Sequence, residues 1–275
     1  MPELPEVETV KRTLEARVKS KRIIGVQIIY GGIIEGIEPW LFQDKVVNRT
    51  IEKLERRGKY LLFHLSGEYL LIIHLRMTGQ LLYVQPDAPK SKHLHLIFFL
   101  DDGRELRYVD MRKFGKIYLI PCASVSNLKG LSSLGVDPLS KEFSLKKFAS
   151  LLEGRTGKIK TILLDQKLIA GIGNIYADEI LFDAGLHPER TGGSLTEEER
   201  GRLYQSIRQI LAKGIAHRGT SIRNYVDGDG RNGSFQKLLK VYGKEGEPCP
   251  LCGCIVSRRK VGGRSSYFCP ACQRI

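Results

Sequence analysis

Residues 249–272 read CPLCGCIVSRRKVGGRSSYFCPAC, with a Cys-x-x-Cys pair at each end and sixteen residues between the two pairs. In a reducing compartment, two such pairs favour a metal site over disulfides. Four thiolates complete a closed tetrahedral site and leave no open coordination position. The spacing therefore predicts one structural Zn²⁺, bound by Cys249, Cys252, Cys269 and Cys272. Cys122 and Cys254 fall outside this spacing and are interpreted as ordinary thiols.

The span between the cysteine pairs predicts a β-hairpin. Gly262-Gly263-Arg264 separates two short segments, Ile255–Lys260 and Ser265–Phe268. A zinc ribbon of this kind can serve for protein contact alone. The cations near the tip favour nucleic acid instead; they are Arg258, Arg259, Lys260 and Arg264.

The charge balance favours a polyanionic partner. The 275 residues include 44 Lys and Arg against 30 Asp and Glu, a net charge of +14. Cationic side chains release counterions when they neutralise phosphates, although ribosomal and membrane-surface proteins share such a charge. The longest apolar runs, such as Tyr69–Leu75, are too short to span a bilayer, and Met1–Thr9 is unlike a secretory signal. We therefore expect a cytoplasmic protein without a membrane partner.

Three segments are predicted, at 1–135, 136–235 and 236–275. The first contains many short β-rich runs without helices between them, which indicates an antiparallel sandwich or barrel with flanking helices. The second has helical spacing of its apolar residues, and the third holds the cysteines. The fold class is thus α+β with several domains.

Local signals place elements within these segments. Asp101-Asp102-Gly103 predicts a hairpin turn, and Thr196 with Glu199 predicts a capping box. A helix is expected to begin near Pro5, where Glu3, Glu6 and Glu8 would suit the positive end of the helix dipole. Residues 219–233 form a long Gly- and Asn-rich loop, which is usually functional or disordered.

Motifs along the whole chain resemble those of the bacterial formamidopyrimidine-DNA glycosylase family. They occur in family order as Pro2-Glu3-Leu4-Pro5-Glu6-Val7-Glu8-Thr9, Arg57-Gly58-Lys59-Tyr60, His74-Leu75-Arg76-Met77-Thr78-Gly79, Asp110-Met111-Arg112-Lys113-Phe114-Gly115, Leu164-Asp165-Gln166 and Gly171-Ile172-Gly173-Asn174-Ile175-Tyr176, followed by the zinc finger. The resemblance implies an N-terminal β-sandwich catalytic domain, a helix–two-turn–helix domain and a zinc-finger hairpin. It also implies a monomer that repairs double-stranded DNA containing damaged bases or abasic sites.

The same resemblance implies a catalytic apparatus. Met1 would be removed, which leaves Pro2 with a secondary α-amine that attacks the sugar C1′ and forms a Schiff base. Glu3 would protonate the sugar ring oxygen, with Glu6 as a supporting group. Lys59 would take part in proton transfer and phosphate contact, and Arg264 would grip phosphates flanking the lesion. Oxidised purines would be excised, and the strand would be cut by β,δ-elimination.

DNA contacts and a lesion loop are implied in the same way. The side chains expected to fill the vacated stack and read the orphaned cytosine are Met77, Arg112 and Phe114. Phosphate or other DNA contacts are expected for His74, His93, Arg155, Lys160 and Asn174, and Asn174 is further expected to cap the helix that follows it. The loop predicted to close over the everted base contains Thr220, Ser221, Ile222, Arg223 and Tyr225. Taken singly, Met77 and Phe114 would more often be core residues.

Two other functions stay open. An endonuclease-eight-like enzyme for oxidised pyrimidines would share the proline, the Glu and the zinc finger. The Pro2-Glu3-Leu4-Pro5 opening, the Met77, Arg112 and Phe114 set and the long loop favour the purine enzyme. A non-catalytic zinc DNA-binding protein is the second alternative, and the intact Pro2, Glu3 and Lys59 argue against it.

Overall fold

The computed structural model describes residues 1–222 and 224–275, which form two compact units. Unit 1 consists of Met1–Ser132 and His217–Gln236, and unit 2 of Ser133–Ala216 and Lys237–Ile275. The first predicted boundary, at 135, lies close to the observed one. The other two predicted segments do not correspond to separate bodies, because residues 217–236 join the β-rich unit and the zinc finger joins the helices.

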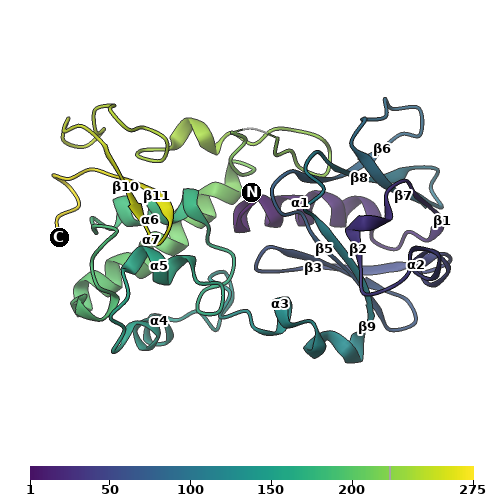
Figure 1. Cartoon of the computed structure of the whole chain (residues 1–275), viewed down its shortest axis with the longest axis horizontal. Coiled ribbons are helices and arrows are strands. Elements are labelled where there is room, and N and C mark those ends of the chain that lie inside the picture. The colour runs from purple at the N-terminus through teal and green to yellow at the C-terminus, as the bar shows by residue number, and fades with distance from the viewer. Residues whose placement is uncertain (223) are drawn as a thin grey trace. The chain divides into compact units, whose positions relative to one another are not determined.

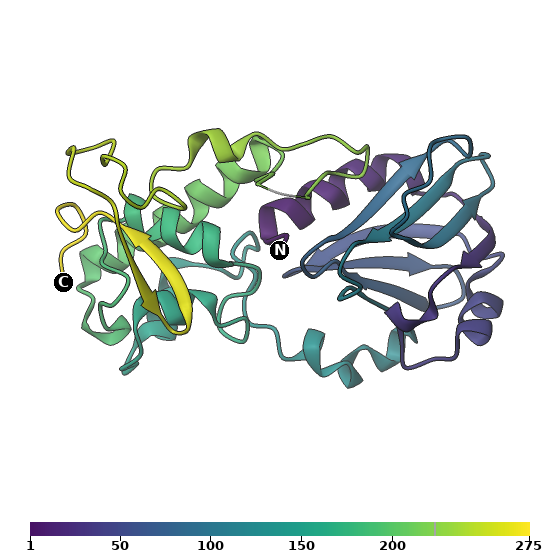
Figure 2. The ribbon, with the colours of Figure 1, turned by 45° about the horizontal axis from the view of Figure 1, so that its top comes forward.

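Unit 1 is built on two β-sheets, which Figures 1 and 2 show in blue. One has the order β1-β7-β8-β6 and the other β2-β9-β5-β4-β3. The pairings are antiparallel except for the short β2–β9 pair, which is parallel. The strands are β1 (Ile23–Ile28), β2 (Ile34–Glu35), β3 (Ile51–Arg57), β4 (Tyr60–Leu65), β5 (Tyr69–His74), β6 (Gly79–Val84), β7 (Leu94–Leu100), β8 (Glu105–Asp110) and β9 (Lys116–Pro121).

A hydrophobic core shared by the two sheets confirms the sandwich prediction. It takes Leu71 and Ile73 from β5 of one sheet and Leu96 and Phe98 from β7 of the other. The predicted turn at residues 101–103 joins β7 to β8, with Gly103 at φ 78°. Three helices belong to the unit, α1 (Leu4–Val18), α2 (Pro39–Val46) and α3 (Lys129–Ser132), with short 3₁₀ turns at Gly31–Ile33 and Cys122–Asn127.

Helix α1 begins one residue before the position predicted from Pro5. Its apolar stripe, Val7, Val10, Leu14 and Val18, is buried and contacts β3, β4 and β6 of the sandwich. Each fully buried side chain of this size contributes on the order of 1.5–3 kcal/mol. A capping box closes the N-terminus, since the Glu3 amide donates to the Glu6 carboxylate at 2.8 Å. The first turn of α1 is therefore rigidly defined.

Unit 2 combines four helices with the zinc-finger hairpin. The helices are α4 (Leu145–Leu152), α5 (Ile159–Leu164), α6 (Asn174–Asp183) and α7 (Glu197–Ala216), with a 3₁₀ turn at Gly192–Ser194. A further 3₁₀ turn, Phe235–Leu238, contains the point in the chain at which unit 1 ends and unit 2 resumes. The predicted capping box of α7 is confirmed: the Thr196 amide donates to Glu199 at 2.8 Å, and the Glu199 amide donates to the Thr196 hydroxyl at 3.2 Å.

The hairpin pairs β10 (Ser257–Val261) with β11 (Arg264–Phe268), as the sequence predicts. Its two-residue turn is Gly262-Gly263, with φ of 54° and 77°. This left-handed backbone suits glycine and is typical of tight hairpins. Within the residues that the structure describes, no helix has the length and apolar character needed to cross a membrane.

Candidate active site and nucleic-acid interface

The N-terminal end of α1 gathers the predicted catalytic groups of unit 1. Pro2 and Glu3 are buried, and Glu3 is 4% exposed. In the full-length chain the Pro2 nitrogen forms the peptide bond to the exposed Met1. Only removal of Met1 makes it an amine.

Lys59 lies in the turn that joins β3 to β4, and this turn is tied to α1. Arg57 pairs with Tyr60 across the hairpin, which leaves Gly58 and Lys59 as the two turn residues. Arg56 donates to the Gly58 carbonyl at 3.0 Å and forms a largely buried ion pair with Glu8 of α1, at 2.8 Å. These contacts fix the Lys59 turn relative to the helix that begins at the predicted catalytic residues.

Glu6 connects the N-terminus to the predicted lesion loop. One carboxylate oxygen accepts the Glu3 amide at 2.8 Å, and the other accepts the Thr220 amide at 2.7 Å. The Tyr225 hydroxyl donates to the Glu6 carbonyl at 3.3 Å. A single buried carboxylate thus holds both the residue next to Pro2 and the beginning of the loop.

The lesion loop is compact in its described part. The Ser221 hydroxyl donates to the Tyr225 carbonyl at 2.8 Å and accepts the Gly233 amide at 2.9 Å. The Thr220 and Ser221 amides are bonded to Glu6 and Gln236. Both amides are therefore used within the fold and do not face a base in this arrangement. Ile222 is half exposed, and Arg223 lies outside the described residues.

His74 is a buried histidine held in its neutral form. Its Nδ1 accepts the Arg76 amide at 3.0 Å, so the ring proton resides on Nε2. Burial, together with the charges of Arg76 and Lys59, lowers the pKa of His74 to about 3. A neutral ring can still donate its Nε2 proton to a phosphate, which is compatible with the predicted contact.

We expect His74 to make unit 1 sensitive to acid. Its folded pKa of about 3 lies below the unfolded value near 6.5, so the unfolded chain binds the proton more tightly between these values. The free energy of unfolding therefore falls as pH drops through this window, by about 2 kcal/mol at pH 5 relative to pH 7. In the His74→Gln variant this contribution is absent. Urea unfolding of both proteins at pH 7 and pH 5 measures it, and a difference between them that does not change with pH would contradict the assignment.

Met77, Arg112 and Phe114 come together on the surface of unit 1. The Arg112 guanidinium lies 4.6 Å from the centre of the Phe114 ring and 3.0 Å from the Met77 sulfur. Met77 is 41% exposed and Phe114 49%, so neither is a core residue. Exposed large apolar side chains beside a cation suit insertion into a base stack.

Asp110 organises this cluster and was not singled out from the sequence. Its side chain is completely buried and accepts the amides of Arg112, at 3.2 Å, and Gly115, at 2.8 Å. A Cβ at Gly115 would lie 1.6 Å from the Tyr108 hydroxyl, so only glycine fits there. Asp110 does open the sequence motif that ends in Phe114-Gly115. Nothing in the neighbouring residues, however, indicates that its side chain is buried and accepts backbone amides.

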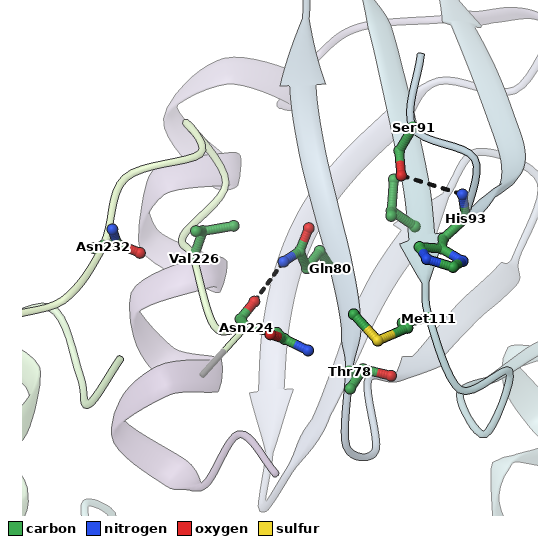
Figure 3. Close-up of a pocket in the computed structure, with 9 residues that line it drawn as sticks. Thr78, Gln80, Ser91, His93, Met111, Asn224, Val226 and Asn232 are labelled. Carbon is green, nitrogen blue, oxygen red and sulfur yellow. Dashed lines mark hydrogen bonds between the residues drawn. The ribbon is translucent and has the colours of Figure 1, made fainter. Parts of the chain in front are cut away.

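A cavity of about 290 Å³ with polar and apolar side chains in its walls lies beside the cluster, within unit 1. Figure 3 shows that strand β6, the segment around His93 and the predicted lesion loop provide its walls. Gln80 donates to the Asn224 carbonyl, and the Ser91 hydroxyl accepts the His93 amide at 3.1 Å. The lining residues are Thr78, Gln80, Ser91, His93, Val109, Met111, Asn224, Val226 and Asn232.

Two of the predicted DNA contacts in unit 2 differ from expectation. Gly173 is the N-cap of α6 and Asn174 its first residue, so Asn174 does not cap the helix. The nitrogen of its side-chain amide donates to the Ser265 carbonyl at 3.0 Å. Lys160 is completely buried and forms an ion pair with Asp178 at 2.6 Å. The structure does not support the direct phosphate contact predicted for Lys160, because no part of its side chain reaches the surface.

Arg155 and Arg264 are both exposed, as DNA contacts require. Arg264 opens β11 directly after the hairpin turn. On the same hairpin, a surface hollow of about 450 Å³ is lined by Arg258, Arg259, Lys260, Gly263 and Ser265. Such a concentration of cations favours a phosphate backbone as ligand.

The four predicted cysteine ligands lie within 4.8 Å of one another, measured between sulfur atoms. Cys249 and Cys272 are 3.9 Å apart, and Cys252 and Cys269 are 3.5 Å apart. Tetrahedral Zn²⁺ with Zn–S bonds of ~2.3 Å requires sulfur separations of ~3.8 Å. The donor set therefore fits one Zn²⁺. Cys122 and Cys254 lie outside this group.

These features define a class of protein: a nucleic-acid enzyme with a β-sandwich, a helical unit and a structural zinc finger. The N-terminal domain of formamidopyrimidine-DNA glycosylase matches residues 1–117, the H2TH domain of that enzyme matches residues 134–226, and the zinc finger found in FPG and IleRS matches residues 246–275. The chain belongs to the formamidopyrimidine-DNA glycosylase family.

Relatives match over the full length. The formamidopyrimidine-DNA glycosylase of Pelotomaculum thermopropionicum is 48% identical over 275 residues, which is all of both chains. The enzyme of Moorella thermoacetica is 52% identical over 253 residues, 92% of each chain. A Lactococcus lactis FPG mutant in complex with Fapy-dG containing DNA has a TM-score of 0.92 and 41% identity, with complete coverage of both chains. The Lactococcus lactis Fpg complex with abasic-site DNA has a TM-score of 0.91 at 41% identity, covering 99% of this chain and 100% of that chain.

The comparisons confirm the predicted family, fold class and zinc finger. The relatives carry the name of the purine enzyme and not of an endonuclease-eight-like one. They do not test the roles of individual residues.

Proposed function

We propose that this protein removes oxidised purines, 8-oxoguanine and formamidopyrimidines, from duplex DNA and then cleaves the abasic strand. The observation that carries the proposal is the buried carboxylate pair at the start of α1, where Glu3 adjoins Pro2 and Glu6 fixes both Glu3 and the loop at Thr220. The relatives named formamidopyrimidine-DNA glycosylase, and the Lactococcus lactis complexes with Fapy-dG and abasic DNA, support the substrate class.

Pro2 is the proposed nucleophile once Met1 has been removed. An α-amine titrates near ~8, against ~10.4 for a lysine side chain, so more of it is unprotonated at neutral pH. Its nitrogen forms a bond to C1′, and the base leaves with the electrons of the glycosidic bond. Glu3 gives its proton to the ring oxygen as the C1′–O bond opens, which leaves a cationic Schiff base at C1′.

Strand cleavage follows from this cation. The Schiff base acidifies the C2′ proton, and loss of that proton expels the 3′ phosphate by β-elimination. A second elimination expels the 5′ phosphate. Lys59 is proposed to assist proton transfer, and the Arg56 contacts that hold its turn against α1 support this role. The exposed Arg264 is proposed to bind the phosphates that flank the lesion.

Base eversion requires a group that occupies the empty position in the stack. The exposed side chains of Met77 and Phe114 are proposed to fill it while Arg112 reads the orphaned cytosine. The cavity beside them has amide, hydroxyl and imidazole groups in its walls, which can hydrogen-bond to the edges of a heterocyclic base.

Loss of Arg112 is expected to relax discrimination against the opposite base. A guanidinium that reads cytosine contributes about 1–3 kcal/mol of preference at that position. We expect Arg112→Ala to reduce the preference for cytosine by this amount. Single-turnover excision from duplexes with each of the four opposite bases measures it. The matched control is Lys113→Ala, because Lys113 lies on the same loop with its amine over the Tyr30 ring at 4.3 Å. An unchanged preference in Arg112→Ala would sink the assignment.

The partner is double-stranded DNA with damaged bases or abasic sites, bound by a monomer. Because the substrate is chromosomal DNA, we place the protein in the bacterial cytoplasm, at the nucleoid.

Borohydride reduction tests the proposed function. It converts a Schiff base to a stable covalent link, so the protein with a free Pro2 should be trapped on an 8-oxoguanine duplex. Efficient trapping only on duplexes with oxidised pyrimidines would favour the endonuclease-eight-like alternative. Binding without trapping on any of them would favour the non-catalytic one.

A further inference from the structure

Unit 2 contains an ion pair that is completely buried. Lys160 of α5 and Asp178 of α6 are each no more than 1% exposed, and their charged atoms lie 2.6 Å apart. Taking two charges out of water costs several kilocalories per mole per ion before their attraction is counted. Such pairs add little net stability, and their best-attested role is to specify one arrangement of the elements they join.

Both members of the pair also hold the backbone of β11. The Lys160 amine donates to the Ser265 carbonyl at 2.8 Å, and the Asp178 carboxylate accepts the Tyr267 amide at 3.1 Å. Asn174 adds a second donor to the Ser265 carbonyl, at 3.0 Å. Two helices thus contribute side chains to a single strand.

The register of the hairpin explains why these groups are available. The turn is closed by the pair Val261–Arg264, so the next pair, Lys260–Ser265, does not exchange hydrogen bonds across the ladder. The C=O of Ser265 and the N–H of Tyr267 therefore point away from β10. Lys160, Asp178 and Asn174 satisfy the edge of β11 that a third strand would otherwise occupy.

The anchored segment adjoins Arg264. Ser265 is the next residue, and the turn on the other side packs on α5, since a Cβ at Gly262 would lie 2.8 Å from the Thr161 hydroxyl. Arg264 itself is exposed. The tip is therefore held on both sides of Arg264, for which a phosphate contact is proposed.

We infer that Lys160 and Asp178 are positioning residues, which hold the backbone beside Arg264 so that its guanidinium is presented to the DNA in one orientation. The inference rests on the proposed DNA binding by Arg264. A preorganised cation binds more tightly because less conformational freedom is lost on binding. Lys160 contributes through Ser265 and not through its own charge.

Two paired variants separate this role from a direct contact. Lys160→Gln with Asp178→Asn removes both charges but keeps a donor for Ser265 and an acceptor for Tyr267. Lys160→Met with Asp178→Leu removes charges and hydrogen bonds together, so that no single charge is left buried. The control is Arg190→Met with Glu199→Gln, which removes a 3.0 Å ion pair of the same unit whose hydrogen bonds, among the described residues, do not reach β11.

The readout is the affinity of each protein for a duplex with a tetrahydrofuran abasic analogue, at several salt concentrations, together with zinc content. We expect the Gln/Asn variant and the control to bind within about threefold of wild type. The Met/Leu variant should bind about tenfold or more weakly while keeping one zinc. Adding Arg264→Ala to it should cause little further loss, because residues that act as a unit are not additive.

Three results would overturn the inference. One is equal weakening of the Gln/Asn and Met/Leu variants with a salt slope lower by about one, as expected for a lost phosphate contact. The second is independence of the two changes: the loss of DNA affinity in the combined variant equals the product of the losses caused by Met/Leu and by Arg264→Ala alone. The third concerns the case in which the Met/Leu variant loses its zinc. The inference then fails if the Gln/Asn variant retains zinc but binds DNA more weakly than wild type. Binding to the analogue involves no chemistry, so failure of the proposed function appears separately, as wild-type protein that binds but is not trapped by borohydride.

Discussion

Glu3→Gln is expected to slow excision of 8-oxoguanine by about 10²–10⁴-fold, the range that a positioned general acid supplies. The amide nearly preserves the shape of the carboxyl group but has no proton to give to the ring oxygen. Glu3 is 4% exposed, and its side chain accepts the Glu6 amide in the capping box of α1, a hydrogen bond that the side-chain carbonyl of Gln can also accept. The substitution should therefore leave α1, and the affinity for lesion DNA, intact.

Single-turnover kinetics on an 8-oxoguanine duplex, compared with a preformed abasic duplex, test this expectation. No base has to leave from an abasic site, so the variant should retain more of its activity there. Glu15→Gln is a matched control on the same helix, because the Glu15 carboxylate is part-exposed and pairs with Lys11 one turn away, at 2.6 Å. Equal losses on both substrates, or a loss of binding, would show that Glu3 is needed for something other than protonating the sugar.

Removal of zinc is expected to abolish DNA binding while unit 1 stays folded. Structural zinc sites contribute about 10–16 kcal/mol of apparent binding free energy at neutral pH. In this chain Cys249 and Cys269 are themselves part of a small core with Phe182, Val241 and Val256. Without the metal, the four sulfur atoms lose the bonds that join the two cysteine pairs, so we expect β10 and β11 to lose the geometry that presents Arg264.

Chelation and the Cys252→Ser variant both test the zinc prediction. Circular dichroism and hydrogen exchange should show loss of the finger with the β-sandwich retained, and binding to abasic DNA should disappear. Cys254→Ser is the control, because its sulfur lies outside the four-sulfur group and zinc should remain bound. Normal abasic-DNA binding by zinc-free protein would refute a structural role.

Elements with local causes could be predicted from the sequence. The zinc finger follows from cysteine spacing, and the capping box of α7 from Thr196 and Glu199, which are three residues apart and bond directly to each other. Helix α1 follows from apolar residues that recur at the spacing of an α-helix. In each case the residues that specify the element lie within a turn or a hairpin of one another.

Features with long-range causes could not be predicted in this way. The segment 217–236 was assigned to the helical domain because it follows α7, but Thr220 is bound to Glu6, more than two hundred residues away. The phosphate contact expected for Lys160 came from the family resemblance, and such a contact requires an exposed amine. Its partner Asp178 follows eighteen residues later on another helix, and no pattern in the sequence links the two.

The covalent step can be tested directly by mass spectrometry of the protein trapped with borohydride on 8-oxoguanine DNA. Protein with Met1 removed should carry the sugar on the Pro2 nitrogen, with every lysine unmodified. Protein that retains Met1 or an N-terminal tag should form no adduct, because its proline nitrogen is an amide. A cross-link on Lys59 or another lysine, with Pro2 unmodified, would contradict the proposed mechanism.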